Sequence, residues 1–312
     1  MPYGTSTPTN KLRRFVRDVI RQRAKAALKK STPPLDADNQ NYYFTDYREN
    51  LLDKMSNEVC KAFAKGSGNE LQRKMAAVYS SSAMTFNIFG NGPVEVKKNT
   101  CGWSVGKYTL QYERQLPVLK RGGKANLDAQ LTNEKEIIFF EMKMQEWLFY
   151  KPSKLAWAYL HDEKRYYNGE MFPVVKNLIE NITPDSTTDL KNYSCKYKHF
   201  DAFQIIKHII GIYNGVVGRQ DEFTKAEKIT LVVGYWTVPL GILQKMPKDI
   251  SGKYKEIEKT MQKEMNSFDK LLPTIKDRFK AVGVKFDLKV MTVEEIITAL
   301  GKANNKKIQR YL

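Results

Sequence analysis

The segment Ile137-Ile138-Phe139-Phe140-Glu141-Met142-Lys143-Met144 decides how this chain is organised. It is a nearly continuous apolar run of strand length, which predicts a buried β-strand. Glu141 and Lys143 interrupt the run, and charges inside a buried strand are costly unless they are paired or hold a metal ion. Because side chains alternate along a strand, both share one face with Ile137 and Phe139. A divalent cation acting on phosphate would account for such a pair.

A second strand, Asn126-Leu127-Asp128-Ala129-Gln130-Leu131, precedes the first one and has an alternating pattern. The polar residues 133–136 predict a hairpin loop whose register places Asp128 opposite Glu141. The Cβ atoms of these two residues would then lie roughly 5 Å apart. Carboxylates at this spacing repel each other, so either one is protonated or a cation lies between them. Mg²⁺ suits this arrangement, because it takes one or two carboxylates, keeps several waters and accepts phosphate oxygens.

The order of Asp128, a twelve-residue gap and Glu141-x-Lys143 resembles the PD-(D/E)xK nuclease superfamily, which includes many type II restriction endonucleases. The resemblance implies a mixed sheet flanked by helices and Mg²⁺-dependent phosphodiester cleavage, with Mn²⁺ as a substitute metal. Asp128 and Glu141 match the metal ligands, and Lys143 matches the catalytic lysine. Leu127 stands where the superfamily name has proline. A wider likeness that begins at residues 66–90 resembles bacterial proteins described as restriction endonucleases.

The acid-x-Lys motif is weak by itself, because it also occurs at Glu95-Val96-Lys97 and at Asp287-Leu288-Lys289. The second of these lies in a predicted strand, residues 284–290, but no hairpin strand with an inward acid precedes it. The alternative interpretation of Glu141 and Lys143 is a solvated strand face with an ion pair. Their apolar neighbours disfavour that alternative.

Two further acids are candidate metal ligands. Glu113 lies within a predicted strand, residues 108–118, where an exposed edge position is the alternative. Glu70 begins a predicted helix, residues 70–82. The resemblance implies that an acid on this helix reaches the metal, whereas the alternative is a glutamate favoured by the helix dipole.

Residues 200–217 predict a helix with an apolar stripe. Gln204 and His208 lie one turn apart on its flank, in a pattern similar to the Gln-x-x-x-Tyr element of some nucleases in the superfamily. The resemblance implies that Gln204 supports catalysis by a hydrogen bond to Lys143 or to a phosphate. A structural, half-buried imidazole is the alternative for His208. The buried strand predicted at residues 228–236 completes a parallel crossover onto the same sheet.

Charge points to a polyanionic partner. The chain has 52 Lys and Arg against 34 Asp and Glu, a net charge of +18. Nucleic acid is the first candidate and acidic lipid the second. Basic residues crowd residues 1–30, where Asp18 is the single acid, and apolar residues there predict a helix. We interpret residues 1–40 as a basic arm that contacts phosphates regardless of sequence. The alternative is a solvated helix packed on the domain.

The remaining composition excludes several classes of protein. Three scattered cysteines and three histidines argue against a structural zinc site and favour a reducing, cytoplasmic compartment. The chain contains no apolar run of membrane-spanning length, and its polar N-terminus does not resemble a secretory signal.

We therefore expect a single nuclease domain at residues 41–312 after the basic arm. Its core would span about 68–238, with an insertion rich in Lys, Tyr and Trp at 147–197 and a helical C-terminal extension at 240–312. The predicted fold class is α/β, with a restriction-endonuclease-like core in which helices flank a central mixed sheet.

The predicted function is Mg²⁺-dependent endonucleolytic cleavage of double-stranded DNA, most simply by a restriction endonuclease of a restriction-modification system. Cleavage of both strands would need a homodimer or two sequential nicks. A structure-specific nuclease of repair, mobile-element or phage-defence type is the first alternative. A non-catalytic DNA-binding protein with the same fold is the second.

Overall fold

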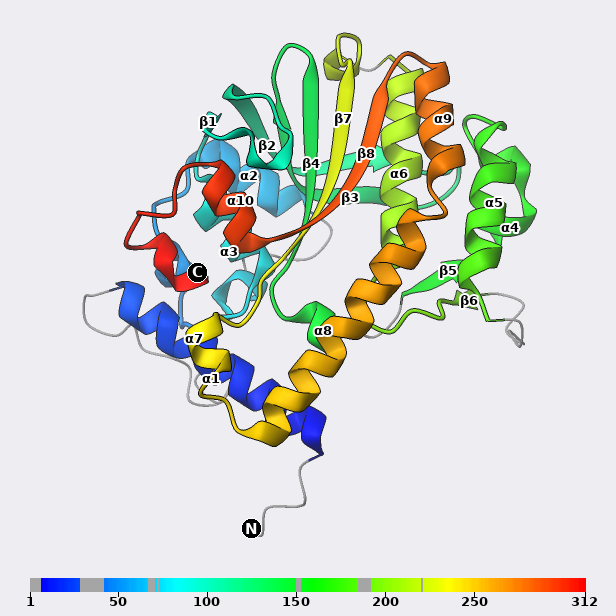
Figure 1. The fold of residues 1–312 in the computed structure, drawn as a ribbon. Coiled ribbons are helices and arrows are strands. Elements are labelled where there is room, and N and C mark those ends of the chain that lie inside the picture. Colours follow the sequence, from blue (N-terminus) through cyan, green and yellow to red (C-terminus); the bar gives the residue numbers. More distant parts are fainter. Residues whose placement is uncertain are drawn as a thin grey trace.

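The computed structural model describes residues 7–28, 42–66, 71, 73–149, 153–184, 192–219 and 221–312. A six-stranded mixed sheet carries helices on both faces (Figure 1), which confirms the predicted fold class. In sheet order its strands are β1 (Val94–Val96), β2 (Gly106–Pro117), β3 (Lys124–Thr132), β4 (Glu136–Lys143), β7 (Lys228–Tyr235) and β8 (Lys285–Thr292). Neighbours from β1 to β4 are antiparallel, whereas β4, β7 and β8 are parallel. A separate two-stranded sheet joins β5 (Lys154–Ala156) and β6 (Asn192–Ser194).

The β3–β4 hairpin has the predicted register, with Thr132 paired to Ile137. Its loop is one residue shorter than expected, because β4 already begins at Glu136. The backbone N–H of Asn133 donates to the Glu136 carbonyl at 3.0 Å, and the Asn133 side chain accepts from two backbone N–H groups of the turn. These bonds close the turn and fix where β4 begins. The side chains of β4 therefore point to the two faces of the sheet that the sequence predicts for them.

The side chains of β4 alternate between two hydrophobic cores. Ile138, Phe140, Met142 and Met144 belong to one core, and Ile137 and Phe139 belong to the other. The first core lies beneath α2 (Asn57–Lys65), α3 (Ser81–Phe89) and α10 (Val293–Ala299). The second lies beneath α5 (Met171–Ile182), α6 (Ala202–Val217) and α9 (Pro273–Ala281). A strand buried on both faces is typical of a parallel neighbourhood covered by crossover helices.

The crossover from β4 to β7 passes through α6, as the sequence predicts. Within this helix, Gly211 has no side chain, and its backbone can therefore lie close to the sheet. A Cβ atom at Gly211 would lie 3.0 Å from the Leu116 Cβ and 3.2 Å from the Ala125 Cβ. The close approach seats the helix on β2 and β3, and its first turns then face the end of β4 (Figure 1).

The remaining helices are α1 (Pro8–Leu28), α4 (Ala158–His161), α7 (Leu240–Leu243) and α8 (Lys248–Asp269). The long helix α8 adds Tyr254 to the first core and Phe268 to the second. Helix α1 packs against α8 and against the C-terminal 3-10 turn Ile308–Tyr311 (Figure 1). Its apolar side is buried. Lys11, Arg14 and Lys25 are exposed, whereas its other arginines are half-buried. No described helix is both long enough and apolar enough to cross a membrane.

The helix predicted at residues 70–82 is wrong for the part that the structure describes. Residues 74–76 form a single 3-10 turn, and α3 begins only at Ser81. The Asn50 side-chain amide donates to the carbonyls of Met75 and Ala77 at 2.8 and 2.7 Å. Ala77 also forms a β-bridge with Tyr43. These contacts use backbone groups that a helix would need, so tertiary pairing overrides the local preference.

Candidate active site

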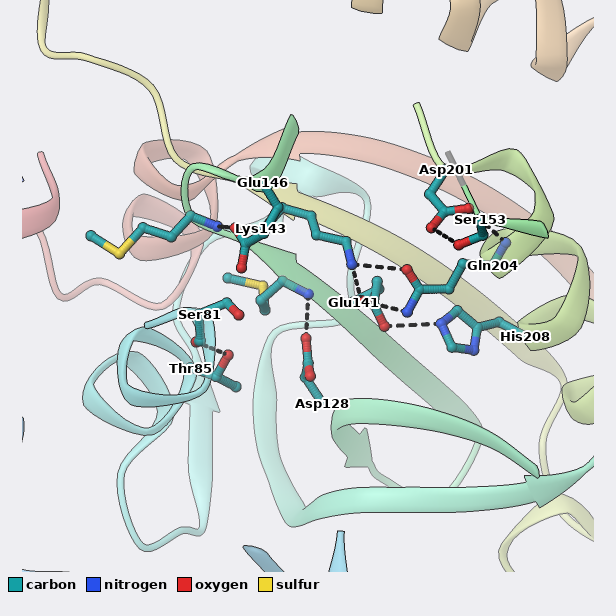
Figure 2. A network of polar contacts seen from close by, with 12 residues as sticks. Ser81, Thr85, Asp128, Glu141, Lys143, Glu146, Ser153, Asp201, Gln204 and His208 are labelled. Atoms are coloured by element: carbon teal, nitrogen blue, oxygen red, sulfur yellow. Dashed lines mark hydrogen bonds and ion pairs between the residues drawn. The ribbon is translucent and has the colours of Figure 1, made fainter. Parts of the chain in front are cut away.

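Glu141 lies near the end of β4, only 4 % exposed, and three side chains bind its carboxylate (Figure 2). Lys143 Nζ donates to Oε1 at 2.6 Å, and Gln204 Nε2 donates to the same oxygen at 3.0 Å. His208 Nε2 lies 2.9 Å from Oε2. The Gln204 carbonyl oxygen accepts from Lys143 Nζ at 2.8 Å and closes a ring of contacts. The charged pair inside the buried strand is therefore fully engaged.

Both members of this pair are charged at neutral pH. Burial would raise the pKa of Glu141, but Lys143 and His208 outweigh burial and hold the pKa at about 2. Burial would likewise lower the pKa of Lys143, yet the carboxylates of Glu141 and Glu146 raise it above its usual value. The site thus contains a lysine that keeps its proton.

Asp128 lies on β3 beside this pair. The β3–β4 ladder ends at the pair Ala129–Phe140, and the next position along it sets Asp128 opposite Glu141, as predicted. Asp128 Oδ2 accepts from the backbone N–H of Met142 at 2.6 Å (Figure 2). Burial and the negative charges of Glu141 and Glu113 raise the pKa of Asp128 well above its usual value. Negative charge is therefore incompletely compensated at this point of the sheet.

Glu113 supplies a third carboxylate from β2. The pairs on either side of it in the β2–β3 ladder place it opposite Asp128. Its backbone has a φ of 51°, in the left-handed region, which interrupts the ladder at this residue. Glu113 is 9 % exposed, and its carboxylate accepts from the Asn126 side-chain amide. It is thus a buried acid at the site and not the exposed strand glutamate of the alternative interpretation.

The donor set suits a hard divalent cation. In the described part of the chain no group of three His, Cys, Asp or Glu side chains is gathered closely enough to enclose a metal. Mg²⁺ does not require such a cage, because it uses one or two carboxylates and completes its shell with water and phosphate oxygens. Burial raises the pKa of Asp128 first, and the neighbouring charges of Glu141 and Glu113 add to the rise; a cation would neutralise this negative charge. Asp128 and Glu141 are the residues that would hold it, with Glu113 next to them.

Helix α6 delivers the two side chains that support Glu141. Asp201 caps the helix by accepting from the Gln204 backbone N–H at 3.1 Å, and Ser153 Oγ donates to the same cap at 2.6 Å. Gln204 and His208 then point together at Glu141 (Figure 2). The buried His208 Nδ1 has no hydrogen-bond partner among the described residues, so the hydrogen bond to Glu141 is what orients the ring. The one-turn spacing of Gln204 and His208 is the sequence signal for this arrangement.

The other candidates lie away from the ring of contacts. Glu146 accepts from the backbone N–H groups of Met144 and Gln145, so it shapes the turn after β4 and acts on Lys143 only through its charge. The competing motif at Glu95 is exposed. In the motif on β8, Asp287 lies 3.9 Å from Lys285 Nζ, and Lys289 Nζ donates to the Cys101 carbonyl, so the acid and the lysine of that motif do not pair with each other. Glu70 lies outside the described residues.

The sequence matches a known family over nearly its whole length. A family model described as restriction endonuclease associating with ARP matches residues 17–312. The chain belongs to this family. No curated protein and no solved structure matches the chain. The match spans every site residue named above.

Proposed function

We propose that this protein is a metal-dependent endonuclease that hydrolyses DNA phosphodiester bonds with a PD-(D/E)xK-type active site. The observation that carries the proposal is the pairing of a charge-compensated carboxylate, Glu141, with an adjacent and poorly compensated one, Asp128. Membership of a restriction endonuclease family supports DNA as the substrate. Mg²⁺ is the proposed cation, with Mn²⁺ as a substitute.

Asp128 and Glu141 would hold the cation between β3 and β4. When bound, a divalent cation neutralises the scissile phosphate and lowers the pKa of a bound water. Gln204 and His208 keep the Glu141 carboxylate in one orientation, so its oxygens need no rearrangement when the substrate arrives. The strand pairing of β3 with β4 fixes the spacing of the two acids.

Lys143 acts as a cation and a hydrogen-bond donor in this proposal. Its pKa is raised, so at neutral pH it holds its proton and is a poor general base. The ammonium group would orient the attacking water and stabilise charge that develops on the phosphate oxygens. Gln204 would keep Lys143 in place, because its carbonyl oxygen accepts from Nζ at 2.8 Å.

Plasmid and phage DNA cleavage in Mg²⁺, Mn²⁺ or EDTA tests the proposal. We expect cleavage in either metal, none in EDTA, and none by Glu141→Gln or Lys143→Met. Glu95→Gln and Lys97→Met are matched controls, because they alter the same motif at an exposed site with a 3.8 Å ion pair. Equal losses in the control and site variants, or cleavage that persists in EDTA, would contradict the proposal.

The pattern of products separates the finer versions of this function. Discrete fragments would indicate a restriction endonuclease, whereas smears or nicks lost in the same variants would indicate a structure-specific nuclease. No cleavage in any metal, with DNA binding retained, would leave a non-catalytic DNA-binding protein. A homodimer should convert supercoiled plasmid directly to linear product, and a monomer should accumulate nicked circles.

A further inference from the structure

Helix α1 carries a row of arginines on its outer side. Arg13, Arg14, Arg17 and Arg21 line an open groove of about 660 Å³ together with Asn10, Asp18 and Tyr42. Asp18 is already engaged, since it pairs with Arg21 at 2.9 Å and accepts from the Tyr42 hydroxyl at 2.9 Å. Among the described residues no carboxylate forms an ion pair with Arg13, Arg14 or Arg17. The groove therefore holds positive charge that the described part of the protein does not neutralise.

The arginines are held on a firm support. Leu12, Val16 and Ile20 form the adjoining apolar stripe of α1 and are at most 2 % exposed. The Arg17 guanidinium lies over the Tyr79 ring at 4.3 Å, and the Arg13 guanidinium lies over the Phe149 ring at 4.9 Å. Stacking of this kind orients a guanidinium plane while its N–H groups stay available to a ligand. The groove is thus organised before any ligand binds.

The groove borders the candidate active site. Arg17 Nε donates to the Gln145 side-chain carbonyl at 3.3 Å, and Phe149 ends the turn that follows β4. Gln145 is two residues beyond Lys143, and two residues span at most about 7 Å, the length of about two base pairs. A polyanion lying in the groove would therefore come close to the end of β4 that carries Glu141 and Lys143.

We propose that the α1 arginine groove, defined by Arg13, Arg14, Arg17 and Arg21, binds the phosphate backbone of the DNA next to the cleaved bond. This inference rests on the proposed nuclease function. Guanidinium groups recognise phosphates by paired hydrogen bonds, and uncompensated arginines release counterions from DNA when they bind it. The contact would fix the position of the duplex over Asp128 and Glu141 and would be independent of base sequence.

Salt-dependent binding of a short random duplex, in EDTA, tests this groove. The test variant is Arg13→Gln/Arg14→Gln, and the matched control is Lys270→Gln/Lys280→Gln, which removes the same charge near α9. That helix lies at the far end of the molecule from α1 (Figure 1). Each lost phosphate contact lowers the slope of log K against log salt by about 0.9, so the test variant should lose about 1.8. The control should keep the wild-type slope.

Equal slopes for the test variant and the wild type would overturn the groove proposal even if the wild type cleaves DNA. A wild type that never cleaves, but whose slope still depends on Arg13 and Arg14, would overturn the nuclease function and leave a DNA-binding groove. Arg14→Gln alone is the control for misfolding, because the Arg14 side chain is exposed and forms no ion pair within the described residues. It should lower the slope by about 0.9 with an unchanged melting temperature.

Discussion

The two ends of β4 each hold a buried glutamate paired with a lysine, and the two pairs differ in their neighbours. Glu136 at the start of the strand is 2 % exposed and lies 2.6 Å from Lys228 Nζ. Its other oxygen accepts from the Ser104 backbone N–H and the Tyr108 hydroxyl at 2.8 and 2.7 Å. Glu141 at the far end is equally buried and has a lysine at the same distance, 2.6 Å.

The difference lies in the acids around each pair. The surroundings of Glu136 are donors that satisfy a single carboxylate, and together they lower its pKa despite burial. Glu141 is also satisfied, but it lies opposite Asp128, whose pKa is raised well above its usual value by burial and by the negative charges of Glu141 and Glu113. A buried glutamate that pairs with a lysine, such as Glu136 with Lys228, therefore does not by itself indicate a functional site. The additional carboxylates of Asp128 and Glu113 are what make the Glu141–Lys143 pair a candidate site.

The Glu136 and Glu141 pairs should differ most in their effect on DNA cleavage. Glu141→Gln and Lys143→Met should each reduce the DNA cleavage rate by about 1000-fold or more, because they would remove the proposed metal ligand and the proposed transition-state cation. Glu136→Gln should leave the rate within a few-fold of the wild type when assayed well below its melting temperature. Initial rates on plasmid in Mg²⁺ measure this contrast. A comparable loss at Glu136 would remove the distinction between the two pairs.

For the free energy of unfolding we expect the larger loss at Glu136. Glu136→Gln leaves the Lys228 ammonium beside a buried neutral amide, and breaking a buried pair in this way costs about 3 kcal/mol of unfolding free energy. Denaturant unfolding followed by circular dichroism measures the loss. The double variant Glu136→Gln/Lys228→Met should recover part of it, because no uncompensated charge is left in the core. No recovery would mean that hydrogen bonds to Ser104 and Tyr108 carry the effect.

Gln204 should affect turnover more than binding. Gln204→Leu keeps the shape of the side chain but removes the amide that joins Glu141 to Lys143, so we expect the cleavage rate to fall about 10- to 100-fold. DNA affinity in EDTA should not change, because the amide is engaged within the site. Single-turnover rates and binding titrations separate these two effects. A weaker affinity with an unchanged rate would assign Gln204 to substrate binding instead.

The smallest effect is a gain in stability at the site itself. Asp128→Asn should raise the melting temperature by a few degrees at pH 7, because a carboxyl with a raised pKa destabilises the fold once it is ionised. The asparagine oxygen can still accept from the Met142 N–H. The gain should fade as the pH falls through 3.8, the ordinary pKa of an aspartate, because below that pH the carboxyl is protonated in both the folded and the unfolded state.

Calorimetric scans of Asp128→Asn across this pH range, without metal, measure the effect. The exposed change Asp277→Asn serves as the control and should move the melting temperature very little. A lower melting temperature for Asp128→Asn at pH 7 would show that the aspartate charge is compensated after all. Cleavage by Asp128→Asn should be lost, so the same substitution would stabilise the fold and abolish the activity.

Local sequence patterns predicted much of the fold. The apolar run of β4, the alternation of β3 and the polar loop between them predict the hairpin, its register and the two faces of β4, because strand periodicity is a local property. The same is true of α6, whose period is clear over its whole length. The helix expected at residues 70–82 failed because Asn50 and Tyr43, distant in sequence, bind its backbone.

By itself the sequence determined that two carboxylates and a lysine lie together on adjoining strands. A hairpin with a short loop leaves one register that keeps the apolar face buried. The sequence named Gln204 and Glu113 as candidates, but only the tertiary structure showed how they meet the site. Gln204 and His208 of α6 contact Glu141, Glu113 of β2 lies opposite Asp128, and Arg17 of α1 reaches the turn after β4. Packing of the helices against the sheet sets the positions of these side chains; at Gly211, for example, it decides how closely α6 approaches β2 and β3. The periodicity of a single segment carries no information about its distance from another segment.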